Sequence, residues 1–196
     1  MTTVADKTAL RVRMRGVRRR LAEELPDAPE QAVRRLPMSR FARFSIVAGY
    51  WSQGSEMNPR PLMEAIRATD PLKVRLALPA AVDKDSPLIF RLWTPDQPLV
   101  PDAVGIPSPP PAAEEVLPNL VIAPLLAFDR EGGRLGQGAG HYDRSIKNLK
   151  AIRAVFVLGL AFAGQELDVV PTDAHDQRLD AILTETEYIE ASKGKP

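Results

Sequence analysis

The run Leu120-Val-Ile-Ala-Pro-Leu-Leu-Ala-Phe128, followed closely by Gly132-Gly-Arg-Leu-Gly-Gln-Gly-Ala-Gly-His-Tyr-Asp-Arg144, decides how we expect the chain to fold. Its first part is almost continuously apolar, which is typical of a strand buried on both faces. Its second part holds five of the chain's twelve glycines, and Asp143 is expected to begin a helix. Strand, glycine loop and helix form the layout of a phosphate site, because free backbone N–H groups can converge there on an anion.

The spacing of the glycines excludes two common nucleotide-binding motifs. No Lys-Ser or Lys-Thr pair follows them, as a P-loop requires. Gly136, Gly138 and Gly140 alternate strictly, whereas the dinucleotide fingerprint is Gly-x-Gly-x-x-Gly. A flexible hairpin loop is the alternative interpretation. The flanking charged residues Arg134, Asp143 and Arg144 favour a polyanion site, on the logic of charge-assisted phosphate binding.

The composition indicates an ordinary globular protein. The 196 residues are 44% hydrophobic and 26% charged, and we expect one domain over residues 1–196. The chain has no cysteine, so disulfide and thiolate chemistry are excluded, and a reducing compartment fits. No apolar run approaches the ~20 residues of a membrane span. We therefore expect a cytoplasmic protein without membrane contact.

Positive charge is concentrated near the N-terminus. The net charge is +1, but residues 1–43 carry +6 and the remainder carries −5. Residues 7–25 are predicted to form an amphipathic helix, whose apolar stripe ends at Leu25 before Pro26. Aromatic residues do not interleave with these cations, so we expect no nucleic-acid partner.

Three cations border the apolar stripe of this helix. On a helical wheel Lys7, Arg11 and Arg18 fall together, in a position from which they can reach into a cleft. The other arginines are expected to form a solvated basic face whose alkyl stems cover apolar surface. These are Arg13, Arg15, Arg19 and Arg20.

Strands and helices are predicted to alternate along the chain, which favours an α/β domain with a mainly parallel sheet. The expected strands are residues 45–51, 73–79, 88–93, 119–128, 153–160 and 180–184, and the further helices are residues 29–35 and 61–68. Residues 95–118 hold eight of the nineteen prolines and are expected to form an extended segment wrapped over the sheet. Ligands of such sheets bind beyond the carboxyl ends of the strands.

Acidic residues near these ends are candidate metal ligands. Asp143 has two interpretations that are compatible with each other, as a Mg²⁺ ligand and as a first-turn carboxylate favoured by the helix dipole. Asp173, His175 and Asp176 have the composition of a hard-metal cluster, although a turn with local Asx bonding is the favoured alternative.

Other polar and aromatic residues are candidates for contacts with an organic ligand. Glu56 follows a strand end and suits an N–H-rich group, while Tyr50 and Trp51 can stack on a flat ring. Core packing is expected for one of these two aromatic residues. His141 is a candidate to orient a ligand or to donate a proton, with a packed loop histidine as the alternative.

Taken together, these motifs resemble those of the 5-formyltetrahydrofolate cyclo-ligase family, also called 5,10-methenyltetrahydrofolate synthetases. The longest matching run is Leu126 to Arg144, without a gap. Other features follow the family order: Lys7-x-x-x-Arg11, Glu56, Pro79, Gly105-Ile-Pro107, His175-Asp176-x-x-Leu-Asp180 and Thr184-Glu185.

The resemblance implies a three-layer α/β/α fold like the sugar-phosphate isomerase and CoA-transferase group. It also implies a ligase that uses ATP and Mg²⁺ to cyclise 5-formyltetrahydrofolate to 5,10-methenyltetrahydrofolate through an N5-iminium phosphate, releasing ADP and phosphate. The expected partners are therefore small molecules, a folate and ATP, and the expected assembly is a monomer or a weak homodimer.

The resemblance further assigns roles to individual residues. Arg134 and Asp143 would be catalytic, and Asp143 and Asp176 would bind Mg²⁺. ATP would contact Lys7, Arg11, Arg134, Leu135, Gly136, Gln137, Gly138, Ala139, Gly140, His141 and Tyr142. The folate would contact Trp51, Glu56, Gln137, Gly138, Ala139, Gly140 and His141.

Two other functions are compatible with the sequence. Gln137 and His141 depart from the residues that the family often has, which leaves open a diverged ATP-dependent enzyme with another substrate. A non-enzymatic module that binds nucleic acid or a partner through the basic first helix is the third hypothesis.

Overall fold

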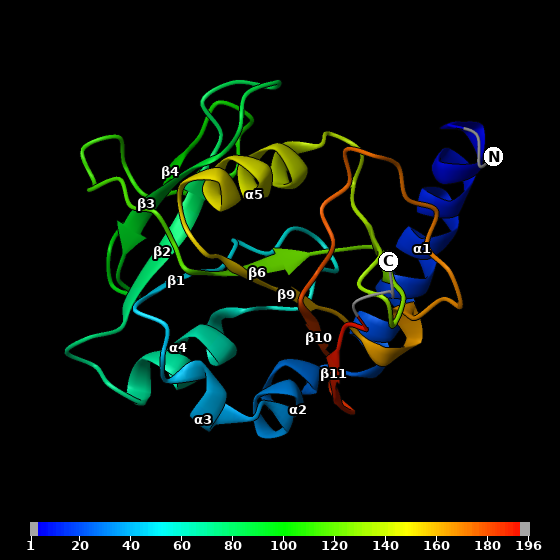
Figure 1. The fold of residues 1–196 in the computed structure, drawn as a ribbon, viewed down its shortest axis with the longest axis horizontal. Coiled ribbons are helices and arrows are strands. Elements are labelled where there is room, and N and C mark those ends of the chain that lie inside the picture. Colours follow the sequence, from blue (N-terminus) through cyan, green and yellow to red (C-terminus); the bar gives the residue numbers. More distant parts are fainter. Residues whose placement is uncertain (1–3, 193–196) are drawn as a thin grey trace.

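The computed structural model describes residues 4–192, and a seven-stranded sheet forms its centre. The strand order is β11-β10-β9-β6-β1-β2-β3 (Figure 1). Five central strands are mutually parallel: β1 (Ile46–Ala48), β2 (Arg75–Ala80), β6 (Leu120–Pro124), β9 (Phe156–Leu160) and β10 (Ala181–Leu183). The two edge strands, β3 (Ile89–Trp93) and β11 (Tyr188–Glu190), are antiparallel to their neighbours. The mainly parallel sheet is thus confirmed.

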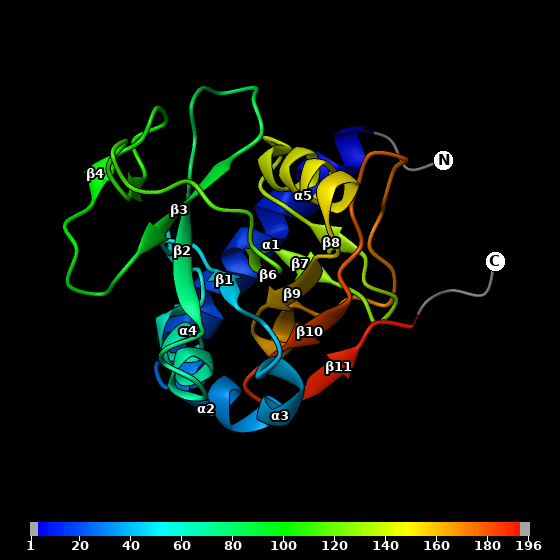
Figure 2. The same ribbon diagram turned by 60° about the vertical axis from the view of Figure 1, so that its left-hand side comes forward.

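Helices cover both faces of the sheet and complete the three layers that the family resemblance implies (Figures 1 and 2). Helices α2 (Ala28–Arg35), α3 (Met38–Phe41) and α4 (Arg60–Ala68) lie on one face, and α5 (His141–Ile152) lies on the other. Successive side chains of a strand point to opposite faces. Accordingly, Leu120 and Ile122 pack on the α2–α4 side, whereas Val121 and Ala123 pack on the α5 side.

Helix α1 (Val4–Glu24) covers a small hairpin beyond the end of the sheet. The hairpin consists of β7 (Ala127–Phe128) and β8 (Arg134–Leu135), and the 3-10 helix η1 (Ala163–Gln165) also contacts α1. Met14 packs in a cluster with residues of this hairpin and with Val170. None of the helices within residues 4–192 combines the length and apolar character that crossing a membrane requires.

The glycine-rich region divides into two parts that the sequence did not separate. The predicted strand 119–128 is wrong beyond Pro124, because the chain leaves the sheet there and forms the β7–β8 hairpin. Gly132 turns this hairpin at φ +85°, and a Cβ on Gly133 would lie 2.4 Å from Oδ2 of Asp129. These two glycines therefore serve the hairpin, and the anion-cradle interpretation applies only to residues 136–140. The helix that follows begins at His141, two residues before the predicted start.

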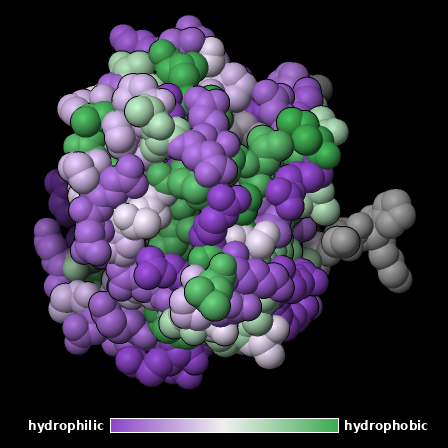
Figure 3. Space-filling view, turned by 90° about the vertical axis from the view of Figure 1, so that its left-hand side faces the viewer, coloured by the Kyte–Doolittle hydropathy of each residue, from purple (hydrophilic) through white to green (hydrophobic). Residues whose placement is uncertain are grey.

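The proline-rich segment is extended, as expected, and its residues 114–116 run along the outer edge of β3. It contains the short strands β4 (Val100–Pro101) and β5 (Pro107–Ser108). The N–H of Leu92 donates to the carbonyl of Glu114 at 2.9 Å, and Val116 then joins the core on the α5 face. Figure 3 views the molecule from the left-hand side of Figure 1, where β3 and β4 lie, and hydrophobic residues at the centre of this face are bordered by hydrophilic ones.

Asp129 organises the β7–β8 hairpin and provides a test of the fold. Its buried carboxylate accepts hydrogen bonds from the N–H groups of Glu131, Gly133 and Val170 at 3.0, 2.8 and 2.8 Å. We predict that Asp129→Ala lowers the free energy of unfolding by about 2 kcal/mol or more, because buried N–H groups lose their acceptor. Urea denaturation measures this change. The exposed Asp96→Ala serves as the control, and an equal effect of both variants would contradict the prediction.

Candidate active site

A cavity of about 1170 Å³ lies beyond the carboxyl ends of β1, β2 and β6. It exceeds the ~300–1,000 Å³ of a pocket for one drug-sized ligand. Its walls come from α1, the segments that follow these three strands, residues 134–140, the start of α5 and the loop 173–176. All fifteen residues that the sequence analysis assigned to the site line it: Lys7, Arg11, Trp51, Glu56, Arg134, Leu135, Gly136, Gln137, Gly138, Ala139, Gly140, His141, Tyr142, Asp143 and Asp176.

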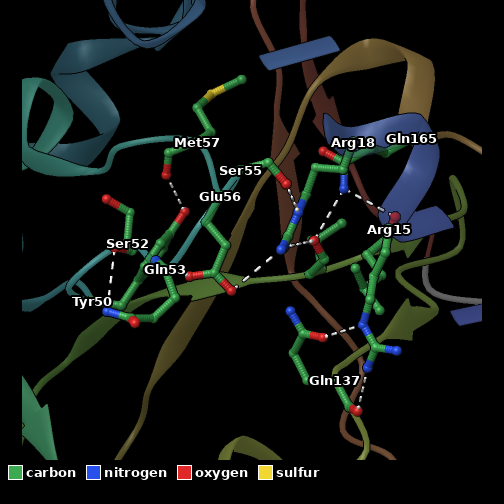
Figure 4. Close-up of polar contacts among 12 residues, drawn as sticks. Arg15, Arg18, Tyr50, Ser52, Gln53, Ser55, Glu56, Met57, Gln137 and Gln165 are labelled. Carbon is green, nitrogen blue, oxygen red and sulfur yellow. Dashed lines mark hydrogen bonds and ion pairs between the residues drawn. The ribbon is translucent and has the colours of Figure 1, made fainter. Parts of the chain in front are cut away.

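The loop of residues 136–140 is held by arginines of α1. Gly138 and Gly140 adopt φ values of +112° and +69°, which L side chains rarely adopt. Arg11 Nε donates to the carbonyl of Gly136 at 3.1 Å. Arg15 is exposed, as predicted for the solvated face, and its Nε also donates to Oε1 of Gln137 at 3.1 Å (Figure 4). Sequence reasoning missed this contact because both partners are exposed and 122 positions apart.

These contacts fix the direction of the peptide groups in the loop. The carbonyls of Gly136 and Gln137 both accept hydrogen bonds from α1. In a trans peptide the N–H points opposite to the carbonyl of the same peptide unit. The N–H groups of Gln137 and Gly138 therefore point away from α1, which leaves them oriented as donors in a loop that lines the cavity.

Arg134 and Asp143 form an ion pair at the start of α5. Arg134 NH2 lies 2.7 Å from Asp143 Oδ1, which also accepts the N–H of Gln177 at 3.0 Å. The Arg134 side chain is almost fully buried, and its Nε has no hydrogen-bond partner among the described residues. Asp143 lies in the first turn of α5, as the helix-dipole interpretation expects. The cation and the carboxylate thus neutralise each other in a wall of the cavity.

Tyr142 lies beside this ion pair. Burial raises the pKa of its hydroxyl, and the charge of Glu56 adds to the increase. The guanidinium of Arg134 lies 5.8 Å from the centre of the Tyr142 ring and acts in the opposite direction. Tyr142 therefore stays neutral at physiological pH and offers an aromatic wall with an uncharged hydroxyl.

Lys7 fastens the loop 173–176 to α1. Its Nζ lies 2.9 Å from Oδ2 of Asp173 and 2.7 Å from Oδ2 of Asp176. Burial opposes the charge of Lys7, but the two carboxylates outweigh it and raise the pKa of the amine. The hydrogen bond from Lys7, aided by the N–H of His175, lowers the pKa of Asp173.

Local bonding confirms the Asx turn in this loop. The N–H of His175 donates to Asp173 Oδ1 at 2.9 Å, and the N–H of Asp173 donates to Asp176 Oδ2 at 2.8 Å. Within residues 4–192, no three acidic, histidine or cysteine side chains form a ready-made metal site. Gln177, the residue after Asp176, nevertheless donates its N–H to Asp143, so that the segments of the two aspartates are in direct contact. Two carboxylates suit Mg²⁺, which keeps waters and takes its other ligands from phosphate oxygens.

Arg18 is the functional residue that sequence reasoning underestimated. It lies on the border of the apolar stripe of α1, as predicted, but the sequence analysis named no residue that it contacts. The side chains of Arg18 and Glu56 are only 6% and 8% exposed, and NH1 lies 3.4 Å from Oε1 (Figure 4). Nε also donates to Ser55 Oγ, and NH1 donates to the carbonyl of Leu125, both at 3.2 Å. Burial lowers the pKa of Arg18, and the charge of Glu56 opposes that change.

The two aromatic residues after β1 have different positions. Tyr50 is buried in the core, where its hydroxyl donates to the carbonyl of Met57 at 2.6 Å. Burial raises the pKa of Tyr50 well above its usual value, and Glu56 adds to the increase. Trp51 is half-buried and lines the cavity. Core packing of one aromatic residue is therefore confirmed.

Further cations line the cavity near α5. His141 Nε2 donates to the carbonyl of Lys84 at 2.6 Å, which holds the loop after β2 against α5. Nε and NH2 of Arg144 are buried without a partner among the described residues. Lys84, Arg144 and Lys147 all line the cavity, although the sequence analysis assigned none of them to the site. The position of Arg144 directly after the glycine loop could have identified it from the sequence, whereas no feature of the sequence pointed to Lys84 or Lys147.

Comparisons with known proteins agree with this geometry. The model of the 5-formyltetrahydrofolate cyclo-ligase family matches residues 3–185. The 5-formyltetrahydrofolate cyclo-ligase of Mycolicibacterium smegmatis is 29% identical over 91% of this chain and 93% of that protein. The Escherichia coli K12 enzyme is 32% identical over 70% of this chain and 76% of its own length. The Haemophilus influenzae enzyme is 36% identical, but the match spans 53% of its length.

Solved structures show the same architecture. The 5,10-methenyltetrahydrofolate synthetase of Aquifex aeolicus superposes with a TM-score of 0.76 at 27% identity, covering 97% of this chain and 95% of that chain. The synthetase of Mycoplasma pneumoniae gives a TM-score of 0.69 at 22% identity, covering 92% and 99%, and supports the fold alone. A family model that spans nearly the whole chain, a shared fold and a cleft lined by the family's motif residues lead to one conclusion: the chain belongs to the 5-formyltetrahydrofolate cyclo-ligase family.

Proposed function

We propose that this protein catalyses the ATP-dependent cyclisation of 5-formyltetrahydrofolate to 5,10-methenyltetrahydrofolate, with release of ADP and phosphate. One observation carries the proposal: a glycine loop with neighbouring cations and the buried carboxylate of Glu56 line the same large cavity. The reaction needs both, because a phosphoryl donor and a folate must meet. The cyclo-ligase relatives, two of which match over most of this chain, support the same assignment.

The triphosphate of ATP is proposed to bind the loop 136–140 together with Lys7, Arg11 and Arg134. The loop contributes oriented N–H groups, and Arg134 contributes a guanidinium with an unpartnered nitrogen. Leu135, Gln137, Ala139, His141 and Tyr142 complete the proposed ATP contacts. Positive charge at this place stabilises the developing charge of phosphoryl transfer.

Mg²⁺ is proposed to bind the carboxylates of Asp143 and Asp176, where it would neutralise phosphate charge. Asp143 is now paired with Arg134, and Asp176 is paired with Lys7. A magnesium triphosphate offers new partners to all four groups, because phosphate attracts the cations and the metal attracts the carboxylates. The donor set therefore fits a metal that arrives with its nucleotide.

The formyl oxygen is proposed to attack the γ-phosphate, so that ADP leaves and an N5-iminium phosphate forms. N10 then attacks the activated carbon, its proton is released, and phosphate departs with the former formyl oxygen. Phosphorylation is needed because an amide oxygen is a poor leaving group. Arg134 is proposed to balance charge on the transferred group, which its position between Gly136 and Asp143 supports.

The folate is proposed to bind the other part of the cavity. Glu56 would accept hydrogen bonds from the N–H-rich edge of the pterin, and Trp51 would contact its ring. Residues 137–141 would contact both ligands, which places the formyl group beside the triphosphate. We further propose that residues 1–196 act as one cytoplasmic domain, as a monomer or a weak homodimer, without nucleic acid or membrane.

The first test is turnover. We predict that the purified protein converts 5-formyltetrahydrofolate to the methenyl product, followed by its absorbance, only when ATP and Mg²⁺ are present. Omission of ATP and addition of a chelator are the controls. Absence of product with folded protein and both ligands would contradict the proposal, and ADP release with other formylated substrates would then identify a diverged enzyme.

A second test concerns Asp143. We predict that Asp143→Ala and Asp143→Asn each reduce kcat by about a hundredfold or more, because they remove the negative charge that is proposed to hold the metal at the phosphates. Circular dichroism is expected to show a folded protein. Exposed Asp168→Ala is the control. Activity of Asp143→Asn close to that of the wild type would refute the role of this carboxylate.

A further inference from the structure

Arg18 connects three parts of the cavity wall that are far apart in the sequence. It extends from α1 to Ser55 and Glu56, which follow β1, and to the carbonyl of Leu125, which follows β6 (Figure 4). Gln165 Nε2 donates to the same Leu125 carbonyl and to the carbonyl of Leu126, both at 3.0 Å. The Leu125 carbonyl that accepts a hydrogen bond from Arg18 is thus also held in place by Gln165.

Glu56 is held on both of its oxygens. Oε1 lies 3.4 Å from NH1 of Arg18, and Oε2 accepts the N–H of Gln53 at 2.9 Å. A carboxylate has about four lone-pair sites. The structure uses one site on each oxygen, and Glu56 lines the cavity, so acceptor capacity remains for a ligand. The two fixed contacts determine where those acceptors lie.

The cost of burial explains why a cation is needed at this position. A carboxylate out of water is strongly unfavourable unless a partner offsets the lost hydration. Arg18 meets Glu56 with a rigid guanidinium that bonds Ser55 and Leu125 at the same time. A lysine has only a point charge on a flexible stem and cannot reproduce this fork.

We propose that Arg18 is a positioning residue for folate recognition, which acts by fixing the Glu56 carboxylate and does not touch the ligand. The proposal rests on the proposed function, because it takes the pterin edge as the partner of Glu56. Lys7, Arg11 and Arg18 share one face of α1, so a single helix supplies cations to the nucleotide end and the anchor to the folate end. Arg18 therefore determines folate affinity and leaves ATP affinity to Lys7 and Arg11.

A purely structural role predicts something different. If Arg18 only fastened α1 through Leu125 and Ser55, its loss would displace Lys7 and Arg11 as well, and the affinities for both ligands would fall together. If Arg18 acts through Glu56, its effect on folate affinity requires the Glu56 carboxylate. A double-mutant cycle separates the two roles, because residues that act through one another are not additive.

The experiment measures dissociation constants for 5-formyltetrahydrofolate and for Mg-ATP separately, by calorimetry. The proteins are the wild type, Arg18→Met, Glu56→Gln, the double variant and the control Arg19→Met, whose residue is exposed on the same helix. We expect Arg18→Met to weaken folate binding about tenfold, as a lost hydrogen bond to a charged group does. We expect the ATP constant to stay within about twofold, Arg19→Met to match the wild type, and the double variant to match Glu56→Gln alone.

Other outcomes overturn the inference. Additive effects of Arg18→Met and Glu56→Gln, or equal losses for folate and ATP, show that Arg18 does not act through Glu56. If Arg18→Met does not fold, the same cycle is run with Arg18→Lys, for which we expect a smaller loss of folate affinity that again disappears in the Glu56→Gln background. If the wild type catalyses the reaction but the double-mutant cycle is additive, only this inference is overturned. If the wild type binds the folate without converting it, only the proposed reaction is overturned. If the wild type does not bind the folate, both are overturned.

Discussion

Arg18 places a guanidinium where two central strands end, and the architecture of the cleft depends on what it contacts there. A buried ion pair gains little over an apolar contact, but removing one partner costs about 3–5 kcal/mol, because the other charge stays buried. Arg18 therefore holds the Glu56 carboxylate in one position relative to β1 and β6. The apolar contacts of Met14 secure α1 against the β7–β8 hairpin. These apolar contacts fix the helix beside the sheet, so that Lys7 and Arg11 line the cavity.

Other charged side chains of the cleft form ion pairs with each other, and a charged ligand can replace the partners in these pairs. Lys7 is shared by Asp173 and Asp176, and Arg134 is bound to Asp143. Lys7 and Arg134 thus each have a counter-charge in the wall of the cavity. Under the proposed function, a magnesium triphosphate would bring both signs of charge and would offer new partners to these cations and carboxylates together. Such a ligand would release the loop 173–176 from Lys7, which would link nucleotide binding to the position of that loop.

Much of this arrangement could be predicted from the sequence because its signals are local. Alternating glycines, the apolar stripe of α1 and the strand-helix alternation each reflect a period or a backbone requirement that operates over a few residues. The mainly parallel sheet follows from that alternation, and all fifteen expected site residues line one cavity. Local signals also explain the errors. The apolar character of residues 119–128 continues through the turn that follows Pro124, because both strands and the turn between them are buried.

The unpredicted contacts are those that depend on three-dimensional neighbours. The apolar stripe of α1 separates Arg18, on its border, from Arg15 on the solvated face, and the structure has Arg18 buried at Glu56 and Arg15 exposed at Gln137. The partners of the two arginines could not be predicted, because Gln137 and Glu56 are far from α1 in the sequence and no short-range pattern encodes such contacts. Gly132 and Gly133 likewise could not be separated from the loop glycines, since their roles depend on Leu179 and Asp129.

A crystal structure with 5-formyltetrahydrofolate, Mg²⁺ and a non-hydrolysable ATP analogue would show whether one cavity brings both substrates together under α1. We expect the triphosphate at residues 136–140, the metal at Asp143 and Asp176, Lys7 released from Asp173, and the pterin on a Glu56 that still contacts Arg18. A nucleotide bound outside this cavity, or a pterin remote from Glu56, would contradict this expectation.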